Sequence, residues 1–497
     1  MKFYLILSIL YREKTFHKYE SAAKMKIKKI PKSLTADQKD IFSKIIENID
    51  KSINVGMVWN NMIALSGAAG TGKTYLIAQM IDLLDDKYNI TVTAPTHKAV
   101  SVIRDYLEDN DILNVSARTI HSFLNIKLFR DFDKGTATFI PDKNKEKNTT
   151  DILIVDESSM VSEDLFEYIH ESIVAENVKV VLFVGDPYQL LPVDSQSHIL
   201  KKISLHYKLK KIVRQAEDSY IIKQSVIVRE MIKTGEFREL DEFLQNGLLS
   251  NIQIFHSPDE FHSDFCKNEK WWDEDKVIAS YSNYDVDYHN KSIRKKYWEE
   301  QKVFGPEVII PGDRLIMQDS NVQGEYILHQ NNDHVIVSSS KKEFFKELNI
   351  YFWDCKDEYS KPFRVVDPDY KKQFNDVLDK IATSAKSEKN FAERKKKWKA
   401  FYELKEFFVD VKYSFASTIH KLQGSTYDTV YIDLYNTNMF SKQDKDTIYR
   451  LIYVAITRAS KEIKILMPNY HIDRFESIGK SLQDAFPDDI NALLAGL

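Results

Sequence analysis

A glycine-rich run early in the chain has the residue types and spacing that hold phosphate groups. Residues 67–74 read GAAGTGKT, which fits the pattern GxxxxGK[ST] between an apolar run and a helical stretch. Glycines let backbone N–H groups approach phosphate oxygens, and a helix N-terminus attracts anions. We therefore expect Lys73 to reach the β- and γ-phosphates of ATP and the Thr74 hydroxyl to ligate Mg²⁺. The predicted loop contacts are Gly67, Ala68, Ala69, Gly70, Thr71, Gly72, Lys73 and Thr74.

An acidic pair, Asp156 and Glu157, follows the apolar run 152–155. Asp156 is expected to hold Mg²⁺, and Glu157 to orient and deprotonate the attacking water, because phosphoryl transfer depends on positioning and charge neutralisation. The other interpretation is a solvated helix start, since Ser158 and Ser159 are residues that cap helices. The phosphate-binding loop upstream favours the catalytic interpretation.

A third polar turn, 185–189 (GDPYQ), follows the apolar run 178–184. A glutamine at a strand end beside a γ-phosphate can sense it and help to place water. Such a turn is common by itself, but its order after the two earlier motifs makes Gln189 a candidate catalytic residue.

Secondary structure must position these turns. Along the chain, short apolar runs alternate with helix-length amphipathic stretches. The runs that predict buried parallel strands are 62–66, 90–94, 151–155 and 178–184, then 277–280, 429–434 and 462–467. Each is followed by a polar turn, as in doubly wound α/β domains. The sequence therefore predicts two α/β layers.

Two insertions interrupt these layers. Residues 302–411 begin with turn-rich, strand-like sequence that suggests a small β-barrel, and the part from 370 to 408 is helical in composition. Residues 124–150 carry a turn at 133–135 between two strand-like runs, which predicts a β-hairpin.

The composition, 43% hydrophobic and 29% charged, is that of an ordinary soluble globular chain. The two cysteines, Cys266 and Cys355, disfavour disulfide and zinc sites and fit a reducing compartment. A net charge of −4 gives no global basic field, although a local groove could still bind nucleic acid. The apolar run 3–10 is too short to span a bilayer, so we expect a cytoplasmic protein without a membrane partner. A start at Met25 is an alternative, because every recognisable motif comes later.

The ordered motifs resemble those of superfamily 1 helicases of the B branch, which contains RecD-like enzymes and the phage Dda type. The resemblance covers about residues 34–467. It implies an α/β fold with two RecA-like motor domains, a β-hairpin insertion in the first, and an SH3-like β-barrel with a helical tower in the second. The implied parts are an N-terminal extension (1–32), a first motor domain (33–245, with the insertion 124–150), a second motor domain (246–301 and 412–497), and the barrel with its tower (302–411).

The resemblance also implies further nucleotide contacts. Gln38 would contact the adenine base, Arg214 would reach the γ-phosphate, and Arg458 would act as a finger across the cleft. Gly424 ends a segment, 417–424, that joins DNA to nucleotide in the family. Closure of the two domains on ATP would then be the power stroke, because the nucleotide holds them by contacts that are lost with product.

A third group of residues is implied to contact single-stranded DNA. They lie in the segments that carry the family's strand-binding motifs, although a histidine at an apolar strand end, taken singly, is usually a residue with its hydrogen bonds satisfied within the fold. They are Pro95, Thr96, His97, Thr119, His121, Ser282, Asn283, Ser417, Thr418 and His420.

The hairpin occupies the position of the family's strand-separating pin. Phe132 or Phe139 could stack on the junction base pair, although both are equally suited to a core. The basic cluster 394–399 (RKKKWK) could meet phosphate or form a solvated helix face.

These observations predict an ATP-dependent helicase that uses Mg²⁺, moves on single-stranded DNA, 5′→3′ by resemblance, and unwinds duplex DNA. Its expected partners are ATP, single-stranded DNA, fork junctions and replication or recombination proteins, in the host cytoplasm if the chain is phage-encoded. An RNA helicase or a protein-displacing translocase of the same branch remains an alternative, because single-strand grooves discriminate sugars weakly. The alternative from another class is a nucleotide-gated switch, against which the candidate catalytic residues argue.

Overall fold

The structure is a computed structural model that describes residues 30–55, 61–110, 112, 114–132, 134–142, 144–191, 199–212, 219–238, 252–323, 326–436 and 444–468. The chain divides into two compact units. The first comprises Met1–Leu124, Glu146–Pro187 and Leu191–Ala216, and the second Asn125–Lys145, Tyr188–Leu190 and Glu217–Leu497. Most of the expected N-terminal extension lies outside the described residues. None of the described helices is long and apolar enough to cross a membrane.

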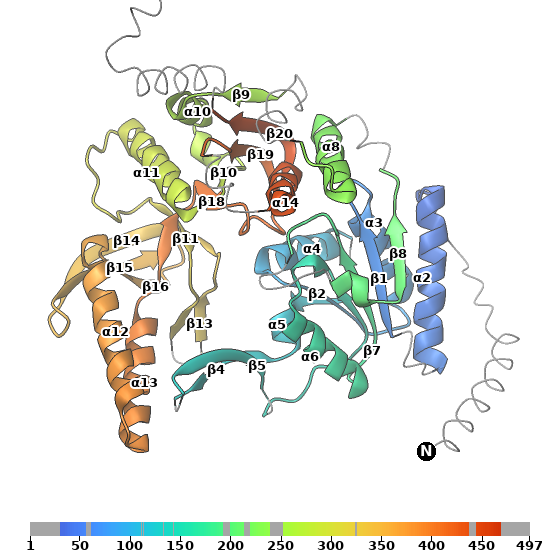
Figure 1. The fold of residues 1–497 in the computed structure, drawn as a ribbon, viewed down its shortest axis with the longest axis horizontal. Helices are drawn as coiled ribbons and strands as arrows, with labels where there is room; N and C mark the ends of the chain where they lie inside the picture. The colour runs from blue at the N-terminus through green and yellow to red at the C-terminus, as the bar shows by residue number, and fades with distance from the viewer. Residues whose placement is uncertain are drawn as a thin grey trace, which may run out of the picture. The chain divides into compact units, whose positions relative to one another are not determined.

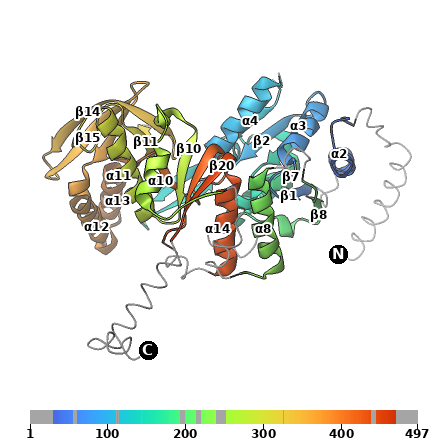
Figure 2. The same cartoon turned by 90° about the horizontal axis from the view of Figure 1, so that it is seen from above.

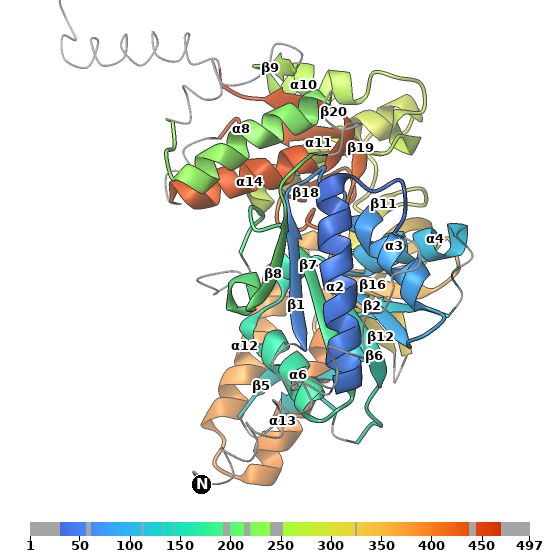
Figure 3. The same cartoon turned by 90° about the vertical axis from the view of Figure 1, so that its right-hand side faces the viewer.

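The first unit is built on a six-stranded parallel sheet with the order β3-β2-β6-β7-β1-β8 (Figures 1 and 3). Its strands are β1 (Met62–Gly67), β2 (Ile90–Ala94), β3 (Ser116–Thr119), β6 (Thr150–Val155), β7 (Val178–Gly185) and β8 (Leu205–Leu209). Its helices are α2 (Ala36–Val55), α3 (Lys73–Leu84), α4 (His97–Asp109), α5 (Ile120–Phe123) and α6 (Glu163–Val174). The apolar stripes of α2 and α3 share one core with β1 and β2. Because all the strands are parallel, the turns that follow them meet at one edge of the sheet.

The second unit contains a five-stranded parallel sheet with the order β18-β10-β19-β20-β9 (Figures 1 and 2). Its strands are β9 (Gln253–Phe255), β10 (Lys276–Ser280), β18 (Ala416–Thr418), β19 (Tyr427–Asp433) and β20 (Ala459–Leu466). Its helices are α8 (Tyr220–Thr234), α10 (Pro258–Phe265), α11 (Asn283–Glu300) and α14 (Lys445–Thr457). One core joins α8 and α14 to the sheet, and a separate core joins α10 and α11 to it. The sheet is therefore covered by helices on both faces.

Antiparallel strands and two helices are inserted between α11 and β18. The five-stranded sheet has the order β16-β15-β14-β11-β17, and β12 pairs with β13 in a separate ribbon. These strands are β11 (Arg314–Met317), β12 (Asn321–Gln323), β13 (Tyr326–His329), β14 (His334–Phe345), β15 (Ile350–Asp357), β16 (Pro362–Val366) and β17 (Val411–Tyr413). Helices α12 (Lys371–Ser387) and α13 (Phe391–Phe407) pack side by side (Figure 1). The hairpin of β4 (Ile126–Asp131) and β5 (Thr136–Pro141) also belongs to the second unit.

The seven expected parallel strands are confirmed, and four strands escaped prediction. The missed strands, β3, β8, β9 and β18, are the two outermost strands of each parallel sheet. An edge strand pairs with a neighbour on one side only, and helices cover less of it than of a central strand. It can therefore form without a continuous apolar run. The hairpin differs in one respect: β4 ends at Asp131, so Phe132 lies in the turn and not in a strand.

Candidate nucleotide and nucleic-acid sites

The phosphate-binding loop connects the end of β1 to the first turn of α3. Gly70 and Gly72 have φ angles of 77° and 78°, a region that residues with side chains rarely adopt. A Cβ atom on Gly67 would lie 2.5 Å from Thr71 Oγ1, so a side chain there would displace Thr71. The glycines of the motif are thus required by backbone conformation and by close packing.

Two long polar side chains brace this loop. Lys73 Nζ donates hydrogen bonds to the carbonyl oxygens of Gly67 and Ala68, at 2.6 and 3.1 Å. Gln38 is buried, and its Nε2 donates to the carbonyl oxygen of Thr71 at 3.2 Å. The structure therefore places Gln38 against the loop, while its contact with the adenine base stays a prediction.

The acidic pair lies at the end of β6. Glu157 has a φ of 47°, a left-handed conformation that is costly for a residue with a side chain. The pKa of Asp156 is raised to about 6, first by burial and then by the neighbouring Glu157 charge, although the Glu157 backbone N–H and the Lys73 ammonium lower it. Lys73 and Asp156 therefore share one site. Ser158 and Ser159 are fully buried, which argues against a solvated helix start.

Three further residues were predicted to contact the nucleotide: Gln189, Arg214 and Gly424. Gln189 belongs to the second unit, where its carbonyl oxygen accepts a hydrogen bond of 2.9 Å from the Arg450 guanidinium. Arg214 lies outside the described residues. Gly424 has a φ of 74°, so its turn favours glycine.

Arg458, at the end of α14, is buried in the second unit. Its guanidinium donates to the carbonyl oxygens of Ser425 and Val454 and to the Thr457 hydroxyl, each at 3.2 Å. Among the described residues no carboxylate forms an ion pair with it. A buried cation without a counter-ion is costly, so an anion that reached this guanidinium would be favoured.

In the first unit, the candidate strand-contacting residues follow two neighbouring strands. Ala94 of β2 pairs in register with Thr119 of β3, so the segments after these strands lie at the same edge. The Thr96 hydroxyl caps α4 by accepting a hydrogen bond from the Ala99 N–H, and the Thr119 hydroxyl caps α5 in the same way. The structure thus brings Pro95, Thr96, Thr119 and the start of α5 together.

The second unit repeats this arrangement. Ser280 of β10 pairs with Thr418 of β18, so the segment with Ser282 and Asn283 lies beside the segment with Ser417, Thr418 and His420. The Tyr281 and His420 rings lie 6.4 Å apart. Each unit therefore presents one polar edge formed at the carboxyl ends of parallel strands.

Comparison with known proteins identifies these features. The model of the AAA domain matches residues 54–253, and that of the UvrD-like helicase C-terminal domain matches residues 413–466. The ATP-dependent DNA helicase dda of Enterobacteria phage T4 is 25% identical, over 86% of this chain and 98% of its own length. The RecBCD enzyme subunit RecD of Haemophilus influenzae is 21% identical, over 84% of this chain and 70% of its own. The chain belongs to the superfamily 1B helicases.

This helicase is an ATP-hydrolysing enzyme, and its two parallel sheets are the RecA-like layers of the family. Uncharacterized protein R530 of Acanthamoeba polyphaga mimivirus is 23% identical, over 81% of this chain and 94% of its own. Among solved structures, Pif1 helicase from Bacteroides in complex with ADP-AlF3 and ssDNA is 16% identical, with a TM-score of 0.44, over 91% of this chain and 98% of its own.

A buried chain of polar groups behind one polar edge of the helicase escaped the sequence analysis. His262 Nε2 lies 2.7 Å from His289 Nδ1, and His289 Nε2 lies 2.9 Å from Asp433 Oδ2. The same carboxylate oxygen accepts a hydrogen bond from the Ser280 hydroxyl at 3.3 Å. Burial, together with the neighbouring His289, lowers the pKa of His262 to about 3. Because α10, α11, β10 and β19 each supply one group, the chain fixes the start of α11, where Ser282 lies. No local pattern signals it.

The hairpin of the helicase is held by α13. Phe132 packs edge-on against Tyr402, with ring centroids 5.9 Å apart. A Cβ atom on Gly135 would lie 1.9 Å from the Trp398 ring. Arg130 Nε donates to Glu406 at 2.8 Å. Phe132 is thus engaged by α13, which leaves it poorly placed to stack on a base.

Phe139, by contrast, is 64% exposed. Phe129 is also exposed and lies on the opposite face, because Phe139 pairs with Leu128 and successive side chains of a strand alternate. Phe129 was not among the predicted pin residues. Of the two predicted pin residues, Phe132 is therefore packed against α13, and Phe139 is exposed to solvent.

Proposed function

We propose that this helicase moves 5′→3′ along single-stranded DNA and separates duplex DNA with its β4–β5 hairpin. The single observation that carries the strand-separation part is the attachment of the hairpin to α13 through Arg130, Phe132 and Gly135. A two-stranded hairpin alone is marginally stable in water. One that is packed against a helix can transmit force to a base pair, and the exposed Phe139 supplies a stacking surface.

The DNA part of the proposal is supported by the polar edges and by the relatives. Both edges offer hydroxyl groups and imidazoles at strand ends, which suit phosphate and sugar contacts. Two of the relatives named above are the ATP-dependent DNA helicase dda of phage T4 and the RecD subunit of the RecBCD enzyme. An RNA helicase of the same branch stays an alternative, which a matched RNA strand would reveal in the ATPase assay.

For the nucleotide we propose that Mg²⁺ binds between Thr74 and Asp156, and that Glu157 activates water. The donor set fits: one hydroxyl and one carboxylate leave most of the octahedral positions to phosphate oxygens and water, as Mg²⁺ prefers. The bound ion would neutralise charge on the β- and γ-phosphates. Gln189, Arg214 and Arg458 are proposed to approach the γ-phosphate.

The direction of movement is tested with forked and tailed duplexes. We expect ATP-dependent unwinding of a duplex with a 5′ single-stranded overhang and at least about tenfold less product from the matched 3′-overhang duplex, a difference of about 1.4 kcal/mol. Blunt duplex measures the background. Equal unwinding of both overhangs, or a preference for the 3′ overhang, would overturn the polarity.

The role of the hairpin predicts a separation of two activities. Phe139→Ala should leave the DNA-stimulated ATPase within about twofold but lower unwinding at least about tenfold, because the fork loses its stacking surface. Phe132→Ala should act in the same direction by loosening the hairpin from α13. Phe129→Ala, on the opposite face, is the matched control and should unwind within about twofold of the parent. If ATPase and unwinding fall in parallel in Phe139→Ala, the aromatic ring is structural and the pin lies elsewhere.

A further inference from the structure

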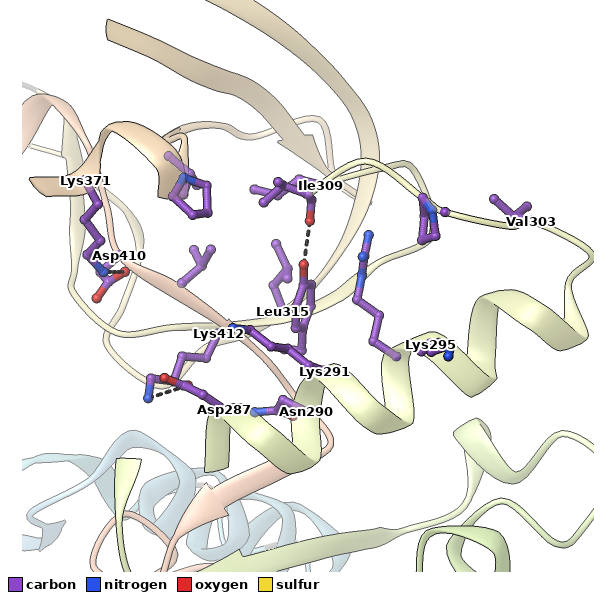
Figure 4. A pocket seen from close by; sticks show the side chains of 18 of the residues that line it. Asp287, Asn290, Lys291, Lys295, Val303, Ile309, Leu315, Lys371, Asp410 and Lys412 are labelled. Atoms are coloured by element: carbon purple, nitrogen blue, oxygen red, sulfur yellow. Dashed lines mark hydrogen bonds and ion pairs between the residues drawn. The ribbon is translucent and has the colours of Figure 1, made fainter. Parts of the chain in front are cut away.

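A cavity of about 610 Å³ lies within the second unit (Figure 4), and one of its lining residues, Lys412, donates a hydrogen bond to Asn283 of the polar edge at 3.0 Å. Its walls come from α11, from the loop 303–309 that follows it, from strands β11, β16 and β17, and from the start of α12. This volume falls within the range of sites that bind drug-sized ligands. Neither ATP hydrolysis nor strand separation, as derived above, makes use of it.

The floor of the cavity is aliphatic. Buried or half-buried branched side chains line it: Val308, Ile309, Leu315, Val365 and Val366. Phe304, at the rim, is 78% exposed, so its ring adds apolar surface beside the floor. An occupant therefore needs an apolar part large enough to cover this floor.

The rim is basic and only partly neutralised. Lys412 pairs with Asp287 and Lys371 with Asp410, each at 2.9 Å (Figure 4). Lys291 and Lys295 lie one turn apart on α11. Lys295 has Glu299 at 3.8 Å, near the limit of an ion pair, and Lys291 has no ion pair among the described residues. Two ammonium groups above the apolar floor are thus available to an anionic occupant.

The cavity is built rigidly. Asp313 accepts hydrogen bonds from Arg294 at 2.7 and 2.8 Å, from the Trp298 indole at 2.9 Å and from the Ile310 N–H at 2.8 Å. The Tyr413 hydroxyl donates to the Val308 carbonyl oxygen at 2.6 Å. These bonds tie α11 to the loop and the inserted strands, so the ordering cost of binding is largely met before an occupant arrives.

We propose that this cavity binds a short acidic segment of a partner protein, with one large apolar side chain on the aliphatic floor and carboxylates at Lys291 and Lys295. Nucleic acid fits less well. The lining has two aromatic rings, Phe304 at the exposed rim and Tyr413 inside. The face of Tyr413 is already covered by the Arg294 guanidinium, 4.6 Å from the ring centroid, so a base could not stack on it. Asp287, Glu299 and Asp410 around the rim would also repel a phosphate backbone, whereas a peptide can place its few charges between them.

The test measures binding of a fluorescein-labelled peptide by fluorescence anisotropy, with the full chain. The probe is a short peptide of aspartate, glutamate and glycine with one central phenylalanine. Replacing that phenylalanine by glycine, or the acidic residues by their amides, should weaken binding at least about tenfold. Lys291→Glu with Lys295→Glu should do the same, and so should Phe304→Ser; all three sites are exposed, so folding should survive. The matched control is Lys223→Glu with Lys346→Glu, at exposed lysines of the same unit that do not line the cavity.

Three results would overturn the proposal. The first is binding that ignores the phenylalanine of the peptide, which would mean non-specific attraction of acid to base. The second is equal loss in the control variant. The third is displacement of the peptide by a short oligothymidylate in a manner that depends on Lys291 and Lys295, which would assign the cavity to nucleic acid. Because the readout is peptide binding without ATP or duplex, failure here is distinguishable from failure of the proposed function.

Discussion

Replacing Lys73 with alanine should lower DNA-stimulated ATP hydrolysis by roughly 10²–10³-fold, the cost of removing one preorganised donor from a site of developing charge. The ammonium already lies within the loop, 2.6 Å from the Gly67 carbonyl oxygen, and its charge acts on Asp156. A phosphate that binds in the loop would therefore contact a lysine ammonium whose position is already fixed. Without that cation, the γ-phosphate loses its main neutralising group on the protein.

The measurement is steady-state phosphate release with saturating single-stranded DNA. Lys44→Ala is the matched control, since this exposed lysine of α2 makes only a surface ion pair with Asp40, which contributes little. If the Lys73→Ala variant keeps an ATPase rate within about threefold of the parent, the loop does not take part in ATP hydrolysis as proposed. A parallel loss in Lys44→Ala would point to a general defect.

Arg458→Ala should lower hydrolysis by about 10³-fold or more, as arginine fingers do, while single-strand affinity without nucleotide stays within about twofold. The Arg458 guanidinium lies at the end of α14 and is buried. Among the described residues it donates hydrogen bonds only to carbonyl and hydroxyl oxygens, so it has no negatively charged partner. The free energy of such a buried cation falls most when an anion binds beside it. Arg458→Lys should recover little, because an ammonium cannot reproduce the planar fork of donors.

The assays are phosphate release and DNA binding by anisotropy, with the thermal midpoint as a check on folding, because truncation removes the hydrogen bonds that Arg458 donates to the Ser425 and Val454 carbonyl oxygens. Arg364→Ala, which removes a partly exposed arginine of the inserted sheet, is the control. An equal loss of DNA affinity in the absence of nucleotide would instead place Arg458 in the strand-binding edge.

Most of the architecture could be predicted from short stretches of sequence. The seven central strands have continuous apolar runs because helices cover the sheet on both faces. Gly70 and Gly72 follow from backbone conformation, and Gly67 follows from close packing against Thr71. The four missed strands lie at sheet edges, where the apolar signal is weak. Local chemistry therefore determined the two α/β layers, the phosphate-binding loop and the acidic pair, because each is encoded within a few consecutive residues.

Only the tertiary structure decided which distant residues meet. Phe132 and Phe139 are alike in sequence, but α13, more than 250 residues further along the chain, engages Phe132 and leaves Phe139 exposed. The chain His262–His289–Asp433 joins groups that are 27 and 144 positions apart, and Asp313 gathers its donors from both sides of a loop. These arrangements depend on helix packing and on burial, which give polar side chains their partners. Burial and packing are properties of the folded chain as a whole, so no local pattern records them.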